Sequence, residues 1–103
     1  MTGYRLTPQA DRRLDEIYDY TASLWGDDQA RRYLGEIFAA FARIAARTVI
    51  WRPTPPHLNL DGYAMRSGSH IIYWREDQVA GVEIISILHQ RMDQTVRLAD
   101  DLS

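Results

Sequence analysis

The feature that most constrains this chain is the spacing of its apolar residues, which changes once along the sequence. From residue 10 to residue 45, apolar side chains recur every three or four positions, as in amphipathic helices. From residue 63 to residue 88 they alternate or run together, as in strands. A segment with three prolines, residues 48–61, separates the two regions. Helices packed on a sheet would bury both apolar faces, so we predict an α+β fold.

Two consecutive helices are predicted before residue 46. Thr7 is suited to cap the first helix and Pro8 to occupy its first turn, and Gly26 ends it. Asp27 or Asp28 is expected to cap the second helix, and so short a connection makes the pair an antiparallel hairpin. Their apolar stripes, which we expect to face the sheet, are Ala10, Leu14, Ile17, Tyr18, Thr21, Leu24 and Trp25, then Ala30, Tyr33, Leu34, Ile37, Phe38, Phe41, Ile44 and Ala45. Tyr20 and Trp51 fit the stripes less well and are possible contact residues.

The remaining elements are predicted to be short. A first strand covers residues 4–6, and strands at 63–66, 70–75 and 79–88 form a three-stranded antiparallel meander. Residues 48–61 are expected to be an irregular crossover held by Trp51 and Leu58, and a short helix should follow His89. The resulting order is β-α-α-β-β-β, with the helical hairpin packed on a small antiparallel sheet and a short C-terminal helix.

One face of the predicted sheet carries Ile71, Tyr73, Ile85 and Ile87 if strand periodicity holds. A period of two does not tell whether this set or the alternate one packs under the hairpin. Whichever face points outward is the expected binding surface for a partner.

Composition excludes several classes of protein. We expect residues 1–103 to form one domain. The chain has no cysteine, and no closely spaced set of histidines and carboxylates suggests a metal site. No run approaches the roughly 20 apolar residues that cross a bilayer, and the N-terminus lacks the apolar core of a secretion signal, so the cytoplasm is the expected location. The net charge is −2, and all twelve basic residues are arginine.

With this order of elements, the sequence resembles the ParE branch of the RelE/ParE toxin superfamily. The segments that carry the resemblance are Tyr4–Ala10, Ile17–Tyr20, Trp25–Gly26, Gln29–Ala30, His70–Arg75 and Ile87–Asp93. The resemblance implies a fold of the microbial-ribonuclease-like toxin type, inhibition of DNA gyrase, and no cofactor or metal. It also implies a cognate ParD-type antitoxin with a ribbon-helix-helix N-terminus, whose extended C-terminal segment wraps and silences the toxin in a hetero-oligomer.

Candidate site residues follow from the ends of the predicted strands. Arg66, Arg75 and Arg91 could form a positive cluster that meets acidic residues of an antitoxin. Equally, each arginine could be solvated or paired internally with a carboxylate, Glu83, Asp61 or Asp93. The candidate antitoxin-binding residues are Arg66, Tyr73, Arg75, Ile85, Ile87 and Arg91. The candidate gyrase contacts are the hairpin tip and the C-terminal segment, namely Trp25, Gly26, Asp28, Arg91 and Met92.

A ribosome-dependent mRNA endoribonuclease of the RelE type is the alternative function. Its site would use Arg66, Arg75 and His89, with His89 as general acid or base. The absence of lysine and the negative net charge disfavour it, no direct nucleic-acid binding is expected of the chain alone, and His89 is more typical of a hydrogen-bonded structural side chain. His57 and His70 are assigned no chemistry. A third possibility is a degenerate toxin that binds only its antitoxin.

Overall fold

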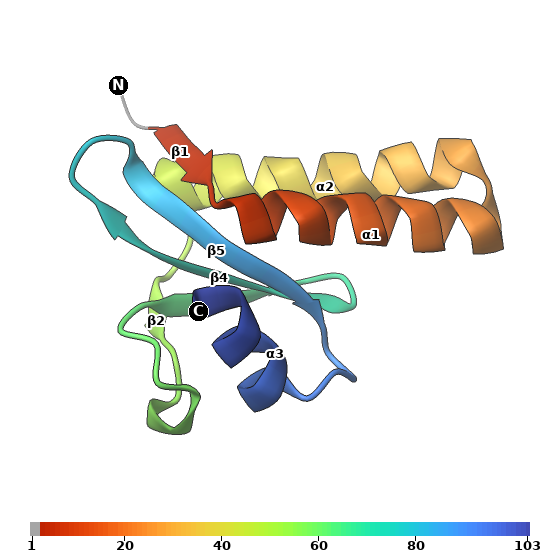
Figure 1. The fold of residues 1–103 in the computed structure, drawn as a ribbon. Helices are drawn as coiled ribbons and strands as arrows, with labels where there is room; N and C mark the ends of the chain where they lie inside the picture. The colour runs from red at the N-terminus through yellow and green to blue at the C-terminus, as the bar shows by residue number, and fades with distance from the viewer. Residues whose placement is uncertain (1–2) are drawn as a thin grey trace.

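A computed structural model describes residues 3–103 as a helical hairpin on one face of a five-stranded sheet (Figure 1). Met1 and Thr2, the first residues of the predicted domain, lie outside the described residues. The elements, in chain order, are β1 (Gly3–Leu6), α1 (Pro8–Trp25), α2 (Asp27–Ala45), β2 (Arg52–Pro53), the 3-10 helix η1 (Pro56–Leu58), β3 (Tyr63–Ser67), β4 (His70–Asp77), β5 (Gly81–His89) and α3 (Gln94–Leu102). The predicted α+β class, hairpin and C-terminal helix are confirmed.

The ends of the hairpin helices follow their local sequence, with one correction. Thr7 caps α1 by accepting a hydrogen bond from the Ala10 amide at 3.1 Å, with Pro8 in the first turn, as predicted. Gly26 ends α1 at a positive φ of 90° and is itself the N-cap of α2. The prediction that Asp27 or Asp28 caps α2 is therefore wrong, because both lie inside the first turn, where their charge complements the helix dipole.

The sheet is larger and less uniform than predicted. Its strand order is β1-β5-β4-β3-β2, and β3, β4 and β5 form the predicted antiparallel meander. The first strand joins this meander by pairing in parallel with β5, from Gly3 beside Gly81 to Leu6 beside Ile84, so the sheet is mixed. The crossover also contains two regular pieces, β2 and η1, where an irregular segment was predicted.

Trp51 and Leu58 hold the crossover in place, as expected. The Trp51 indole N–H donates to the Ile44 carbonyl oxygen at 3.1 Å, which ties the crossover to the end of α2. Leu58, in η1, is buried on the opposite face of the sheet.

A β-bulge decides which residues of the sheet face the hairpin. The register between β4 and β5 shifts after Tyr73, which pairs with Ser86 while the neighbouring Trp74 pairs with Ile84. Ile85 is thereby passed over, so Ile85 and Ile87 point to opposite faces although they are two residues apart. The predicted shared face is therefore wrong: Ile87 packs under the hairpin, while Tyr73 and Ile85 lie on the other side.

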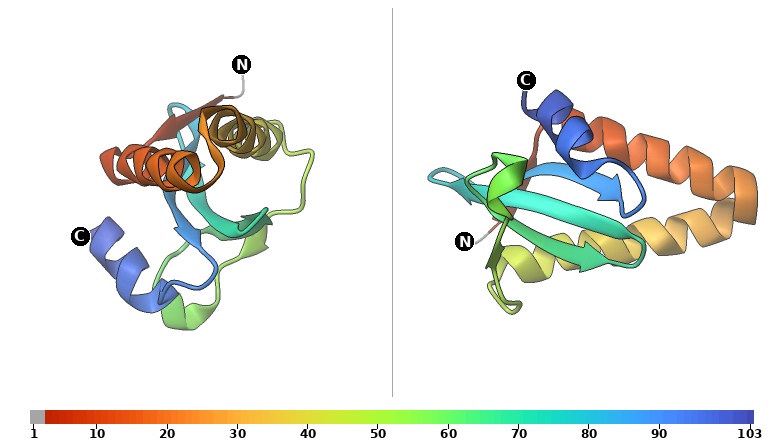
Figure 2. Two further views of the ribbon diagram at one scale, coloured as in Figure 1. Left: turned by 90° about the vertical axis from the view of Figure 1, so that its right-hand side faces the viewer. Right: turned by 90° about the horizontal axis from the view of Figure 1, so that it is seen from below.

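The sheet is covered on both faces, and Figure 2 shows the hairpin and α3 on opposite sides of it. The hairpin side holds the larger core, in which Ile37, Phe41 and Trp74 are fully buried. The α3 side holds a smaller core, in which Leu98 is fully buried against a group made up of Leu58, Leu60, Tyr73, Ile85 and Leu88. The outward sheet face predicted as a binding platform is thus occupied by α3 and η1.

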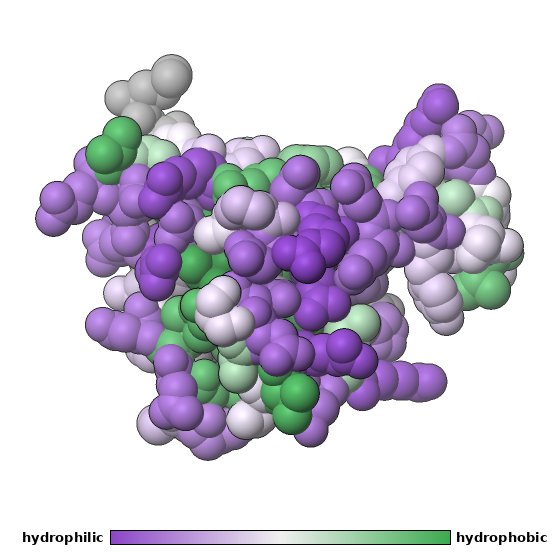
Figure 3. Space-filling view, viewed as in Figure 1, coloured by the Kyte–Doolittle hydropathy of each residue, from purple (hydrophilic) through white to green (hydrophobic). Residues whose placement is uncertain are grey.

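The tip of the hairpin extends past the sheet (Figure 1). Trp25 is 72% exposed, and Leu24 and Phe38 are also exposed, so the expectation that the whole aromatic stripe packs on the sheet is wrong for these positions. The cause is geometric, since helices of 18 and 19 residues outrun the strands beneath them. Figure 3 shows a small hydrophobic area among pale and hydrophilic side chains at the end of the hairpin. No helix in the described part of the chain is long and apolar enough to cross a membrane.

Candidate functional site

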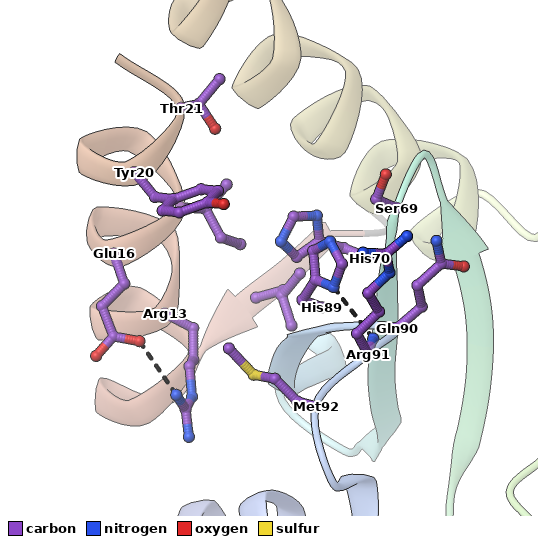
Figure 4. A pocket seen from close by; sticks show the side chains of 12 residues that line it. Arg13, Glu16, Tyr20, Thr21, Ser69, His70, His89, Gln90, Arg91 and Met92 are labelled. Atoms are coloured by element: carbon purple, nitrogen blue, oxygen red, sulfur yellow. Dashed lines mark hydrogen bonds and ion pairs between the residues drawn. The ribbon is translucent and has the colours of Figure 1, made fainter. Parts of the chain in front are cut away.

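A cleft of about 590 Å³ opens between α1 and the end of the β4–β5 ladder. One wall is the face of α1 that carries Arg13, Glu16 and Tyr20, three and four residues apart. The other wall consists of His70 at the start of β4, His89 at the end of β5 and the loop that follows β5 (Figure 4). The cleft combines an apolar floor, to which Ile17 and Ile87 contribute, with cationic and hydrogen-bonding side chains at its rim.

His70 is held firmly at the back of the cleft. The Tyr33 hydroxyl from α2 lies 2.5 Å from His70 Nδ1 and also accepts a hydrogen bond from the Ser69 backbone amide at 3.1 Å. Burial, together with the nearby His89, lowers the pKa of His70 from 6.5 to about 4. His70 is therefore a neutral imidazole at neutral pH.

His89 lies beside His70 because the two residues pair directly across β4 and β5. Their ring centroids are 5.1 Å apart and the ring planes are nearly perpendicular, at 85°. The backbone amide of Arg91 donates to His89 Nδ1 at 3.1 Å (Figure 4), which orients the ring. His89 remains half-buried, with access to the cleft.

Arg13 links the cleft to α3. Its guanidinium donates two hydrogen bonds to the Asp101 carboxylate, at 2.9 and 3.1 Å, and a third to Glu16 at 3.1 Å. The hydrogen bonds to Asp101 raise the pKa of Arg13 against the opposing effect of burial. Ser86 of β5 donates to the same Asp101 carboxylate. The positive charge of Arg13 is thus compensated by two carboxylates, and α3 is docked through this contact.

The three arginines that were candidates for a positive cluster have different surroundings, and Arg75 lies at the other end of the sheet from Arg66 and Arg91. Arg66 is exposed on β3 and its Nε donates to the Gly68 carbonyl oxygen at 2.9 Å. Arg75 lies at the far end of β4, where its Nε donates to Glu83 at 2.8 Å, so the alternative of an internal partner holds for this residue. Arg91 lines the cleft. Asp93, another partner considered for these arginines, instead caps α3.

The remaining candidate residues fall into two groups. Tyr73, Ile85 and Ile87 are all buried, at 1–2% exposure, and burial raises the pKa of Tyr73, whose hydroxyl donates to Gln94 of α3. The other group is accessible. It consists of the hairpin tip with Trp25, Gly26 and Asp28, and of Arg91 and Met92 at the cleft.

Arg75, one residue of the alternative ribonuclease site, lies away from His89. His70 and His89 pair at one end of the β4–β5 ladder, while Arg75 pairs with Glu83 near the other end. The structure instead places His89 with His70, Arg13 and Arg91. His70 and Arg13 were not predicted as site residues. Two signals were available in the sequence: the antiparallel pairing of the strands that carry His70 and His89, and the helical spacing of Arg13 and Tyr20. Among residues 3–103, no group of three or more side chains could hold a metal ion.

The fold of this chain matches that of a solved structure. A chain in the solved structure of the chromosomal ParDE TA system from P. aeruginosa has the same fold, with a TM-score of 0.70 at 20% identity, and the match covers 86% of this chain and 96% of that chain.

Sequence comparisons then define the family. The family model for the ParE toxin of the type II toxin–antitoxin system parDE matches residues 4–94. Toxin ParE1 of Mycobacterium tuberculosis (strain H37Rv) is 38% identical over 91 residues, covering 87% of this chain and 91% of that protein. Toxin ParE1 of Caulobacter vibrioides is 35% identical over 98 residues (95% and 99%), and Toxin ParE of Escherichia coli is 33% identical over 105 residues (99% and 98%). The chain belongs to the ParE toxin family of type II toxin–antitoxin systems, within the RelE/ParE superfamily.

Proposed function

We propose that this toxin acts by binding DNA gyrase and is silenced by a ParD-type antitoxin with a ribbon-helix-helix N-terminus. The observation that carries the proposal is the end-to-end match to ParE toxins, which spans residues 4–94 in the family model. The geometry supports a binding protein rather than an enzyme. Its most exposed large aromatic side chain, Trp25, projects at the hairpin tip, where it is available to a partner.

Cleavage of mRNA is the second candidate because the cleft brings two histidines and two arginines together. The charges of these groups argue against it. A phosphodiester transition state needs concentrated positive charge and a proton donor near neutral pH. His70 has a pKa of about 4, and Arg13 is already paired with Asp101 and Glu16. Among the described residues, Arg91 of the cleft makes no ion pair with a carboxylate.

We assign gyrase contact to the hairpin tip, with Trp25, Gly26 and Asp28, and to Arg91 and Met92. For the antitoxin, the accessible candidates are Arg66, Arg75 and Arg91. Tyr73, Ile85 and Ile87 are reachable only by a partner that displaces α3 or the hairpin, since all three are buried beneath these elements.

A supercoiling assay tests the gyrase proposal. Purified toxin should inhibit supercoiling of relaxed plasmid by gyrase and leave a translated message intact. Trp25→Ala should abolish inhibition without loss of stability, because the side chain is 72% exposed. Val79→Ala is the matched control, since Val79 is 96% exposed in the turn between β4 and β5, remote from the tip. Cuts at codon positions with normal supercoiling would support the ribonuclease instead.

Two further observations test the antitoxin proposal. The protein encoded beside this reading frame should co-purify with the toxin and restore supercoiling. Expression of the toxin alone should stop growth. Unimpaired growth at good expression would indicate a degenerate toxin that retains only partner binding.

A further inference from the structure

We propose that the cleft between α1 and the end of the β4–β5 ladder is a carboxylate-binding pocket, which takes one acidic side chain of a protein partner together with an adjoining apolar side chain. The inference rests on the proposed function in one respect, since the antitoxin is the expected source of that segment.

Both histidines of the cleft have one ring nitrogen engaged within the protein and one that faces no protein partner in the described part of the chain. The Arg91 amide donates to His89 Nδ1, which leaves Nε2 as the nitrogen of His89 that offers a proton to the cleft. The Tyr33 oxygen accepts the Ser69 amide, and we assign the phenol as the donor in its hydrogen bond to His70 Nδ1. We therefore assign the Nε2–H form to His70 as well. Both rings then offer an N–H donor, and within residues 3–103 no protein acceptor engages either Nε2.

The orientation and protonation of His70 are fixed by its surroundings. A pKa of about 4 keeps His70 neutral at physiological pH, so its Nε2–H is a hydrogen-bond donor that carries no net charge. The ring cannot rotate without breaking its hydrogen bond to Tyr33. Such a preorganised donor has little entropy to lose when an oxygen atom binds it.

The two walls of the cleft differ in whether their arginine is paired with a carboxylate. Arg13 is held by Asp101 and Glu16, so that corner of the cleft presents no free cation. Arg91, on the opposite wall beside His89, makes no ion pair among the described residues. One unpaired guanidinium and two imidazole N–H donors match a single carboxylate. A nucleic-acid backbone, with its row of phosphates, would meet carboxylates at the Arg13 corner.

The floor and part of the edge of the cleft are apolar. Ile17 and Ile87 are buried beneath it, while Met92 and the ring of Tyr20 stand at its edge (Figure 4). Tyr20 is 65% exposed and Met92 is 37% exposed, so a ligand can cover apolar surface that now meets water. A bare anion would leave this surface uncovered, whereas a peptide with an apolar residue beside its acid would fill it.

The test uses two blocked peptides that differ only in charge, acetyl-Leu-Glu-Leu-amide and acetyl-Leu-Gln-Leu-amide. Nitrogen-15 spectra of the imidazole rings report binding at His70 and His89 directly. The glutamate peptide should shift both Nε2 signals, and the glutamine peptide should bind about tenfold more weakly or worse, since a charge-assisted hydrogen bond is lost. Arg91→Gln should weaken the glutamate peptide by about the same factor. Arg97→Gln on α3, which removes equal charge outside this cleft, should leave binding unchanged.

Three outcomes would overturn the pocket: unshifted histidine signals, equal binding of both peptides, or tighter binding of a uridine pentanucleotide than of the glutamate peptide. Failure of the pocket proposal can be distinguished from failure of the proposed function. If the antitoxin binds wild type and Arg91→Gln equally well, the pocket proposal fails while the antitoxin proposal stands. If the peptide binds in the cleft but no antitoxin is found, the pocket proposal stands while the antitoxin proposal fails.

Discussion

Replacing His70 should remove a specific acid sensitivity from the folding stability of this toxin. In the folded protein the pKa of His70 is about 4, against 6.5 for an unperturbed histidine. Because the folded value is the lower one, the unfolded chain binds more protons between these two values. The free energy of unfolding should therefore be intact above about pH 6.5 and decline as the pH falls toward 4.

The two pKa values set the size of this effect. Linkage gives a loss of about 2 kcal/mol when the pH is lowered from 7.5 to 5, a range that stays above most carboxylate titrations. Water reaches the ring from the cleft and screens part of the perturbation, which reduces the expected loss to about 1 kcal/mol. His70→Gln should lack this component, since a glutamine oxygen can accept the Tyr33 proton and does not titrate.

The assay is urea denaturation of wild type and His70→Gln at both pH values. His57→Gln is the matched control, because His57 is exposed in η1 and this variant should keep the wild-type pH dependence. Equal pH dependence of wild type and His70→Gln would refute the reasoning. If that variant folds poorly, the His70 ring of the wild type can be titrated by NMR instead. A titration midpoint near 6.5 would also refute the reasoning.

Three other substitutions test the packing of the fold. Leu98→Ala should lower the free energy of unfolding by about 2 to 5 kcal/mol in urea denaturation, because it empties the core under α3, and a cost below about 1 kcal/mol would contradict that core. Gly68→Ala should lower the melting temperature, because φ is +58° and the new Cβ would lie 2.8 Å from the Tyr33 ring; an unchanged melting temperature would argue against this turn. Asp101→Asn should speed hydrogen exchange of the α3 amides by weakening the contact with Arg13, and unaltered exchange would mean that α3 is held by its apolar face alone.

The hairpin was predictable because its signals are local. Thr7, Pro8 and Gly26 act on the residues next to them, and a three- and four-residue apolar period needs no knowledge of the partner surface. The same local signals failed at the tip, because whether Trp25 is buried depends on how far the strands beneath it extend.

The face of the sheet was not predictable from alternation. A single bulge after Tyr73 moves Ile85 out of step with Ile87, and nothing in the run of isoleucines marks where the extra residue falls. The cleft depended on contacts between distant segments for the same reason. Arg13 is one of several charged residues on α1, and its contact with Asp101 of α3 is what distinguishes it. His70 was assigned no chemistry, because its contacts with Tyr33 and His89 join segments that are far apart in the sequence.

The parallel pairing of β1 with β5 also has a consequence for when the protein can become active during translation. Thr7, directly after β1, donates its side-chain hydroxyl to the Ile85 carbonyl oxygen, 78 positions further along the chain. The nascent chain cannot complete its sheet until that last strand has left the ribosome, because the N-terminal strand has no partner before then. A prematurely terminated product would lack β5, to which α1, β1, β4 and α3 all attach. A folded toxin can therefore form only after β5 has been synthesised and has left the ribosome.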